Sequence, residues 1–270
     1  MRRWLICLLL IGLFSLWGVN TTALAKPDRA NISQEKLEQG DAIAKKAFQA
    51  TSQGDFAQAE IYWTELIADF PRNPAVWSNR GNLRVIQNKL DEAIADFDQA
   101  IAITDKFPDP YLNRGIAYEL KHDWDNAIAD YNRVLAINPQ DPVAYNNRGN
   151  AEAGQGKWRD ALADYEQASA IAPRFAVARA NSALVTYQLG DRQEALRQVR
   201  NLVRKYPTFA DVRAAITAML WAEGQQGKAE SNWVAAVGLD RRYQSLDWVA
   251  SIRRWPPTMV EALGKFLTLD

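Results

Sequence analysis

The sequence predicts an all-α protein made of stacked helix-turn-helix repeats. The first observation is a period, because the pattern that begins at Pro108 recurs every 34 residues from Gly40 to Tyr243. The second is that small residues and bulky aromatic residues keep fixed positions in each period, as closely packed helix pairs require. The third is that glycine recurs at one turn of the period and proline at the other. Such an uninterrupted period is typical of a solenoid rather than of a closed globular domain.

The first 25 residues are expected to be a secretory signal peptide. Arg2 and Arg3 precede an apolar run from Trp4 to Gly18, and Ala23-Leu24-Ala25 forms an A-x-A cleavage site. We therefore expect export and cleavage after Ala25. The alternative is an uncleaved leader that anchors the chain in a membrane at its N-terminus.

Loss of the leader leaves a chain without cysteine and without a strong net charge. Cys7 is the only cysteine, so the mature chain has no thiol nucleophile, disulfide framework or cysteine-based zinc site. The full chain has 32 basic and 32 acidic residues, and the leader holds two of the former and none of the latter, so the mature formal charge is −2. This balance argues against a nucleic-acid partner, because phosphate binding needs an excess of basic residues.

Residues 26–39 are expected to form a polar linker that merges into the first helix. Six repeats then follow without a gap, over 40–73, 74–107, 108–141, 142–175, 176–209 and 210–243. Counting the first residue of each repeat as position 1, position 8 is small in five repeats (Ala47, Gly81, Gly115, Gly149 and Ala183) and position 20 is always alanine. Position 24 is aromatic in five repeats, which predicts that large side chains fill the space beside the small ones.

The two turns of the repeat have their own signals. Glycine at position 15 (Gly54, Gly156, Gly190 and Gly224) predicts a left-handed residue that ends the first helix. Asp55 with Gln58, and Asp191 with Glu194, are start signals for the second helix. Proline at position 32 (Pro71, Pro139, Pro173 and Pro207) is expected to stop that helix.

Residues 244–270 are expected to form two short C-terminal capping helices. Apolar residues recur at helical spacing on both sides of Trp255-Pro256-Pro257, and the proline pair separates them. We expect these helices to cover the open end of the last repeat.

The period and its pattern of small, aromatic, glycine and proline residues resemble the tetratricopeptide repeat family. The resemblance covers about three quarters of the chain. It implies a right-handed α-solenoid that serves as a binding scaffold, a fold used for many different clients. The Trp-Pro-Pro tail resembles that of exported repeat proteins of photosynthetic bacteria and plastids, which implies the periplasm or a thylakoid lumen as the compartment.

No residue pattern points to catalysis, to a cofactor or to a metal. His122, the only histidine, stands at the turn position 15 and is expected to be a solvated turn residue. Asp91-Glu92 and Asp123 with Asp125 lie near the starts of second helices, where they complement the helix dipole. We therefore expect a non-enzymatic protein.

A row of asparagines is the candidate client contact. Asparagine stands at position 6 of four consecutive repeats and at position 9 of two of them, as Asn79, Asn113, Asn147 and Asn181, with Asn82 and Asn150. The resemblance implies that these positions lie in or beside a concave groove. An amide donates and accepts at once, so the row can pair with the backbone of an extended peptide. The other interpretation is that the row joins adjacent repeats, and the two uses are compatible.

A basic stripe is the second candidate contact. Arg197, Arg200 and Arg204 fall on one face of the second helix of the fifth repeat. Such a stripe is either ordinary solvated surface or a docking surface for an anionic membrane or an acidic partner.

These observations predict an interaction scaffold or assembly factor that holds a peptide segment of a partner protein in its groove. The alternative is a homo-oligomeric organiser of a membrane protein complex, such as one in photosystem assembly. The sequence names neither the client nor the oligomeric state.

Overall fold

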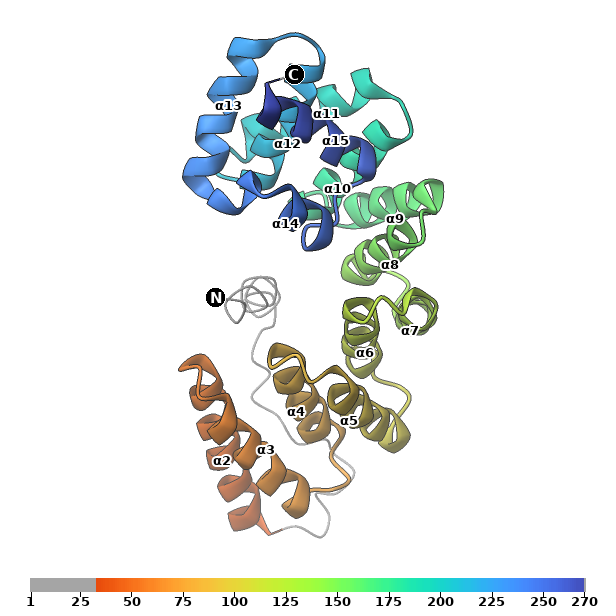
Figure 1. Cartoon of the computed structure of the whole chain (residues 1–270). Helices are drawn as coiled ribbons and strands as arrows, with labels where there is room; N and C mark the ends of the chain where they lie inside the picture. The colour runs from red at the N-terminus through yellow and green to blue at the C-terminus, as the bar shows by residue number, and fades with distance from the viewer. Residues whose placement is uncertain (1–32, 270) are drawn as a thin grey trace. The chain divides into compact units, whose positions relative to one another are not determined.

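The computed structural model describes residues 33–269, whose regular structure is entirely helical (Figure 1). The expected signal peptide and residues 26–32 of the expected linker lie outside the described residues. Of the linker, residues 34–39 belong to the first described helix. No helix in residues 33–269 is both long enough and apolar enough to span a membrane.

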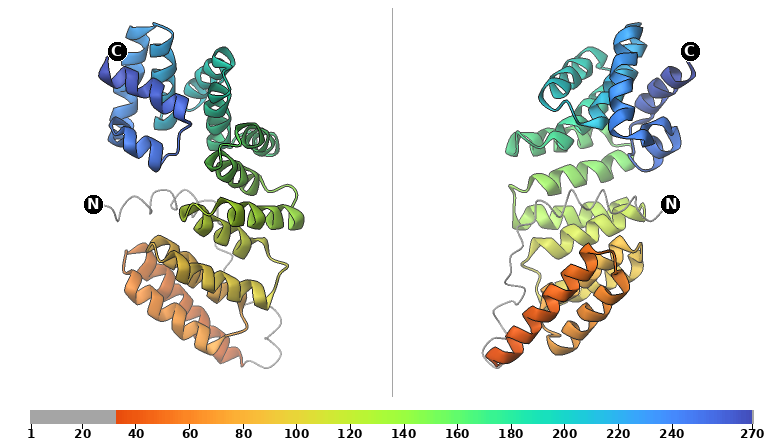
Figure 2. Two further views of the ribbon diagram at one scale, coloured as in Figure 1. Left: turned by 45° about the vertical axis from the view of Figure 1, so that its right-hand side comes forward. Right: turned by 90° about the vertical axis from the view of Figure 1, so that its left-hand side faces the viewer.

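The contacts divide the chain after Pro139 into two compact units. The N-terminal unit contains α2 (Gln34–Ser52), α3 (Phe56–Asp69), α4 (Pro74–Ile86), α5 (Leu90–Ile103), α6 (Pro108–Leu120) and α7 (Trp124–Ile137). The C-terminal unit contains α8 (Pro142–Gly154), α9 (Trp158–Ile171), α10 (Ala176–Gln188), α11 (Arg192–Lys205), α12 (Ala210–Ala222), α13 (Gln226–Leu239), a 3-10 turn η2 (Arg241–Gln244), α14 (Leu246–Ser251) and α15 (Pro257–Thr268). Consecutive helices pack as pairs, one pair in each expected repeat (Figure 2).

The helices begin where the sequence predicts. The Asp55 carboxylate accepts a hydrogen bond from the backbone N–H of Gln58, and the Asp191 carboxylate accepts one from that of Glu194, which confirms both start signals. The first helices α4, α6 and α8 each begin at a proline, whose missing N–H is not needed at that position.

The turn between the two helices of a pair requires a left-handed residue. The four glycines predicted for this role have φ of +79°, +74°, +97° and +71° (Gly54, Gly156, Gly190 and Gly224). Asn88 and His122 take the same place in the second and third repeats, with φ of +60° and +61°. His122 is exposed, as expected of a turn residue.

The predicted packing of small against aromatic residues is also confirmed. A Cβ atom added to Gly81 would lie 2.7 Å from the ring of Phe97, and one added to Gly115 would lie 2.6 Å from the ring of Tyr131. No relaxed Cβ contact is that short, so these helix pairs need glycine on the first helix.

The C-terminal tail lies elsewhere than expected. Two short helices, α14 and α15, do flank the Trp255–Pro256 bend. The structure places α15 against α12 and α10, the first helices of the last two repeats, instead of over the outer side of the last repeat. The physical reason is the hydrophobic effect, because Met259, Leu263 and Phe266 are buried in one cluster with residues of α10 and α12.

Candidate functional site

Three arginines hold the helix pairs of the second, third and fourth repeats together. Each comes from an Asn-Arg-Gly tripeptide on a first helix and donates two hydrogen bonds to an aspartate 16 residues later on the second helix. The pairs are Arg80–Asp96 (2.9 and 2.7 Å), Arg114–Asp130 (2.8 and 2.6 Å) and Arg148–Asp164 (2.7 and 2.7 Å). These pairs were not predicted from the sequence, although an aspartate follows each of the three arginines at the same spacing.

These ion pairs lie where water has little access. The Asp130 carboxylate is almost fully buried, and burial raises its pKa even though Arg114 opposes that shift. The hydrogen bond to Asp130 in turn raises the pKa of Arg114. A carboxylate in this position is stable only while its guanidinium partner remains, so the pairs are structural rather than free for a ligand.

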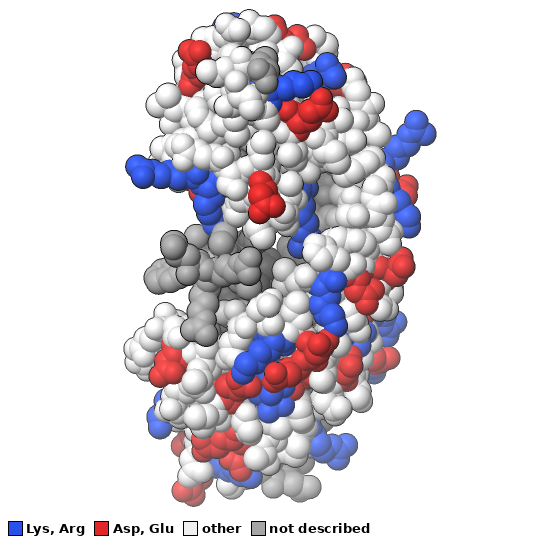
Figure 3. Space-filling model, viewed as in Figure 1, with Lys and Arg blue, Asp and Glu red and all other residues white. Residues whose placement is uncertain are grey.

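Charges of both signs lie side by side on the N-terminal unit. Arg84 donates to Asp96 at 2.8 Å and to Glu60 at 3.1 Å, and Lys89 also reaches Glu60 at 2.7 Å. In Figure 3 basic and acidic side chains accordingly alternate over α4 and α5 instead of forming a field of one sign. No cluster of His, Cys, Asp or Glu in residues 33–269 has the make-up of a metal site.

In the C-terminal unit the asparagines bond to one another. The Asn181 amide on α10 donates to Asn146 Oδ1 (3.2 Å) and Asn150 Oδ1 (3.3 Å) on α8, and the Tyr165 hydroxyl donates to Asn150 Oδ1 (3.0 Å). Asn147 is buried and accepts a hydrogen bond from Asn146. This part of the row therefore joins the fourth repeat to the fifth.

In the N-terminal unit the row is more open. Asn79 and Asn82 are half-buried, and their amides make no hydrogen bond within the described part of the chain. Asn113 is only 8% exposed, and its Nδ2 is buried without a hydrogen-bond partner. Asn79 and Asn82 are therefore the members of the predicted row whose amides are accessible to another molecule and unused by the described fold.

Position 9 of the first helices is accessible in the first three repeats and buried in the last two. In the N-terminal unit its residues are Phe48, which is 42% exposed, and the half-buried Asn82 and Ile116. In the fifth and sixth repeats they are Leu184 and Ala218, which are 3% and 0% exposed. We call the side of α2, α4 and α6 that carries Phe48, Asn82 and Ile116 the open first-helix face.

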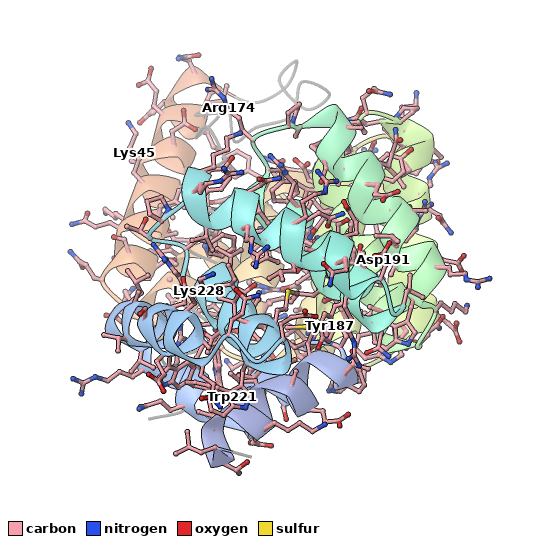
Figure 4. The ribbon with its side chains drawn as sticks, turned by 90° about the horizontal axis from the view of Figure 1, so that it is seen from above. Lys45, Arg174, Tyr187, Asp191, Trp221 and Lys228 are labelled. Atoms are coloured by element: carbon pink, nitrogen blue, oxygen red, sulfur yellow. The ribbon has the colours of Figure 1, made fainter. Side chains whose placement is uncertain are left out.

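The first helices of the fifth and sixth repeats, which bury Leu184 and Ala218, pack against α15. Tyr187 of α10 and Trp221 of α12 lie next to α15 in Figure 4. The Phe266 ring meets the Trp221 ring edge to face, with centroids 5.3 Å apart. The side of α10 and α12 that corresponds to the open first-helix face is thus filled by a helix of the same chain.

A buried carboxylate fastens the segment that leads into α15. Asp211 of α12 accepts hydrogen bonds from the Tyr243 hydroxyl (2.6 Å), from Arg253 Nη2 (2.6 Å) and from Trp255 Nε1 (2.9 Å). Burial alone would raise the pKa of Asp211, but Arg253 and the two other donors bring it below its ordinary value. Asp211 therefore stays ionised and holds the tail against the last repeat.

The basic stripe is on the surface, as the helical spacing indicates. Arg197, Arg200 and Arg204 are all exposed on α11. Arg197 pairs with Glu194 at 2.5 Å, and Arg204 donates to Asn201. The glutamate offsets part of the positive charge of the stripe.

Comparisons with known proteins agree with this architecture. The family model described as "Tetratricopeptide repeat" matches residues 114–182, and the one described as "TPR repeat" matches residues 81–122. A search of curated protein sequences finds no match.

Solved structures with the same fold include several repeat proteins. A tetratricopeptide repeat protein from Parabacteroides merdae is 20% identical, with a TM-score of 0.63 over 86% of this chain and 99% of its own. The MamA protein is 21% identical, with a TM-score of 0.55 over 62% of this chain and 92% of its own. YrrB, described as a TPR protein with an unusual peptide-binding site, is 19% identical, with a TM-score of 0.52 over 66% of this chain and 92% of its own. At these identities the likeness establishes the fold, and the family models identify tetratricopeptide repeats within residues 81–182.

Proposed function

We propose that this protein is a non-enzymatic scaffold or assembly factor that holds a segment of a partner protein on its open first-helix face. A role as an interaction scaffold agrees with the tetratricopeptide repeats of the chain, because proteins with these repeats are generally non-catalytic binding proteins. We assign the client to α2, α4 and α6.

One observation carries the assignment. Phe48, Asn82 and Ile116 stand one repeat apart and remain accessible, whereas the corresponding residues of α10 and α12 are covered by a helix of the same chain. A ring, an amide and an aliphatic group in a row offer apolar contact and a hydrogen-bond donor and acceptor to a peptide backbone. That YrrB is described as having a peptide-binding site supports peptide binding as a use of this fold.

We propose further that the protein is exported, to the periplasm or to a thylakoid lumen. The support is the sequence of residues 1–25, with its two arginines, apolar run and A-x-A site. Mass spectrometry of the protein made in a cell that exports it measures the N-terminus. A start at Lys26 supports cleavage, and an intact Met1 favours the membrane-anchored alternative.

Contact with an anionic membrane surface is part of the proposal and rests on the stripe of Arg197, Arg200 and Arg204. Reversal of all three charges should weaken binding to vesicles that contain anionic lipid by about 1 kcal/mol for each residue at the surface. Reversal of three exposed basic residues elsewhere, Lys45, Lys46 and Arg174, is the matched control. Equal loss in both triple variants would assign the binding to net charge rather than to the stripe.

A homo-oligomeric organiser is the second candidate function. It is favoured by α13, which exposes the apolar side chains of Val234 to 74% and Leu239 to 44%. Exposed apolar side chains of this kind are available for contact with a second copy. Light scattering after size exclusion tests it, because a mass that stays monomeric at every accessible concentration rules this candidate out.

A peptide library displayed on phage tests the proposed client face. The full chain selects binders, and each binder is measured again with Asn82→Ala and with the control Gln99→Ala, which alters an exposed residue of the second helix α5. Binding that Asn82→Ala weakens and Gln99→Ala leaves unchanged supports the open first-helix face. Binders that respond to neither change, or to Gln99→Ala alone, place the client elsewhere.

A further inference from the structure

We propose that α15 is an internal ligand, and that the face of α10 and α12 beneath it takes an amphipathic α-helix of a partner protein when α15 leaves. The inference rests on the proposed scaffold function and deepens it, because it names the kind of segment that is bound. We call the side of α10 and α12 that contacts α15 the helix-binding face.

The bound helix shows which partner would fit. The buried residues of α15 are Met259, Ala262, Leu263 and Phe266, which recur at the spacing i, i+3, i+4 and i+7. Glu261 and Lys265 point to solvent on the other side and pair with each other. This is the pattern of a helix laid into an apolar groove, so a partner helix needs apolar residues at the same spacing.

An aromatic residue at the last of these positions is the main specificity element. The Phe266 ring meets Trp221 of α12 and Trp233 of α13 edge to face, with centroids 5.3 and 5.2 Å apart. Two indole rings around one phenyl ring select a planar side chain by shape and by the preferred geometry of aromatic pairs.

The first turn of the bound helix has a polar contact as well. Gln188 of α10 accepts a hydrogen bond from the Thr258 backbone N–H (3.0 Å) and one from its hydroxyl (2.8 Å). The first N–H groups of any helix lack partners within that helix, so Gln188 can receive the first turn of a partner helix in the same way.

The connection before α15 allows it to leave alone. Arg253 and Trp255, which are fastened to Asp211, come before the bend, and α15 comes after it. Pro256 holds an extended backbone between them, with φ −54° and ψ 145°. The hydrogen bonds of Asp211 therefore fasten the segment before the bend and involve no residue of α15.

The test uses the full chain and a fluorescent peptide with the sequence of residues 254–269. Phe266→Ala weakens the internal ligand, and Phe107→Ala, at an exposed phenylalanine of the N-terminal unit, is the matched control. We expect the peptide to bind Phe266→Ala about tenfold more tightly than the wild type or Phe107→Ala, because a larger fraction of the helix-binding face is free. A peptide in which alanine replaces Phe266 should not compete. Equal binding to all three proteins, or no binding to any, overturns the proposal.

Hydrogen exchange of the wild-type chain gives a second measurement that requires no variant. The backbone N–H groups of α15 should exchange faster than those of α12, because α15 opens locally. Exchange of both helices at one rate would make α15 a permanent part of the core and overturn the inference. Neither experiment on α15 tests client binding at the open first-helix face, which Asn82→Ala tests separately.

Discussion

Arg114 donates hydrogen bonds to both carboxylate oxygens of Asp130, from Nε to Oδ2 at 2.8 Å and from Nη2 to Oδ1 at 2.6 Å. The pair connects α6 with α7, and equivalent pairs connect α4 with α5 and α8 with α9. A buried ion pair adds little net stability by itself, but loss of one partner leaves a buried charge without compensation.

We therefore expect Arg114→Ala to lower the free energy of unfolding by about 3–5 kcal/mol. Arg133→Ala is the control, because Arg133 pairs with Asp105 at the surface and such pairs contribute about 0–1 kcal/mol. Urea unfolding of both variants measures the difference. Equal small losses would show that water reaches the Arg114–Asp130 pair.

Gly115→Ala should destabilise the protein by about 1–3 kcal/mol, because its new methyl group would overlap the Tyr131 ring. Gly227→Ala is a matched helical control with nothing within 4 Å of the added carbon. There alanine should stabilise α13 by about 0.5–1 kcal/mol, since glycine is the weaker helix former. Thermal midpoints that move in the same direction would contradict this account of the small positions.

Glu152 should make stability depend on pH. Burial, and then the nearby charge of Asp164, raises its pKa to about 7, and its Oε2 atom is buried without a hydrogen-bond partner. A carboxyl whose pKa is higher in the folded state than in the unfolded state stabilises the fold when protonated. That contribution is complete below the ordinary pKa of 4.5 and is lost as the pH rises through about 7.

The expected loss between pH 5 and pH 8 is on the order of 1 kcal/mol, allowing for the partial access of water to this side chain. Glu152→Gln should remove the dependence, since an amide does not titrate. Urea unfolding of the wild type and the variant at the two pH values measures this difference. If the free energy of unfolding of the variant changes with pH as much as that of the wild type, the dependence belongs to another group.

The two parts of the asparagine row should respond differently to mutation. Asn181→Ala removes two hydrogen bonds to α8, so it should lower stability by about 0.5–1.5 kcal/mol for each bond lost. Asn82→Ala removes no hydrogen bond within the described chain and should leave the melting curve unchanged. If Asn82→Ala lowers the midpoint as much as Asn181→Ala does, the row is structural in both units.

Much of the fold was predictable because it depends on local chemistry. The left-handed turn at Gly54, the cap at Asp55 and the stop before Pro71 each involve residues close in sequence. Small residues facing rings, such as Gly115 and Tyr131, could be paired because the period repeats the same signal. The six helix pairs were therefore accessible from the sequence alone.

What escaped prediction depends on how separate helices meet. The pairing of Arg114 with Asp130 depends on how α6 packs against α7, which the sequence does not show. Within the tripeptide Asn-Arg-Gly, the asparagine rather than the arginine was the predicted contact residue. The tail lies outside the period, so no repeat signal indicated that Phe266 reaches Trp221. Leu184 of α10 is buried in the apolar cluster that also contains residues of α15, a contact between segments far apart in the sequence.

The central claim is that α2, α4 and α6 present the client-binding face, and site-specific photo-crosslinking tests it most directly. A photo-reactive amino acid is placed at position 48, 82 or 116 of the full chain, or at the control position 99, and the protein is irradiated with a selected library peptide bound. The account predicts adducts at the first three positions and none at position 99. Adducts of equal yield at all four, or at position 99 alone, would contradict it.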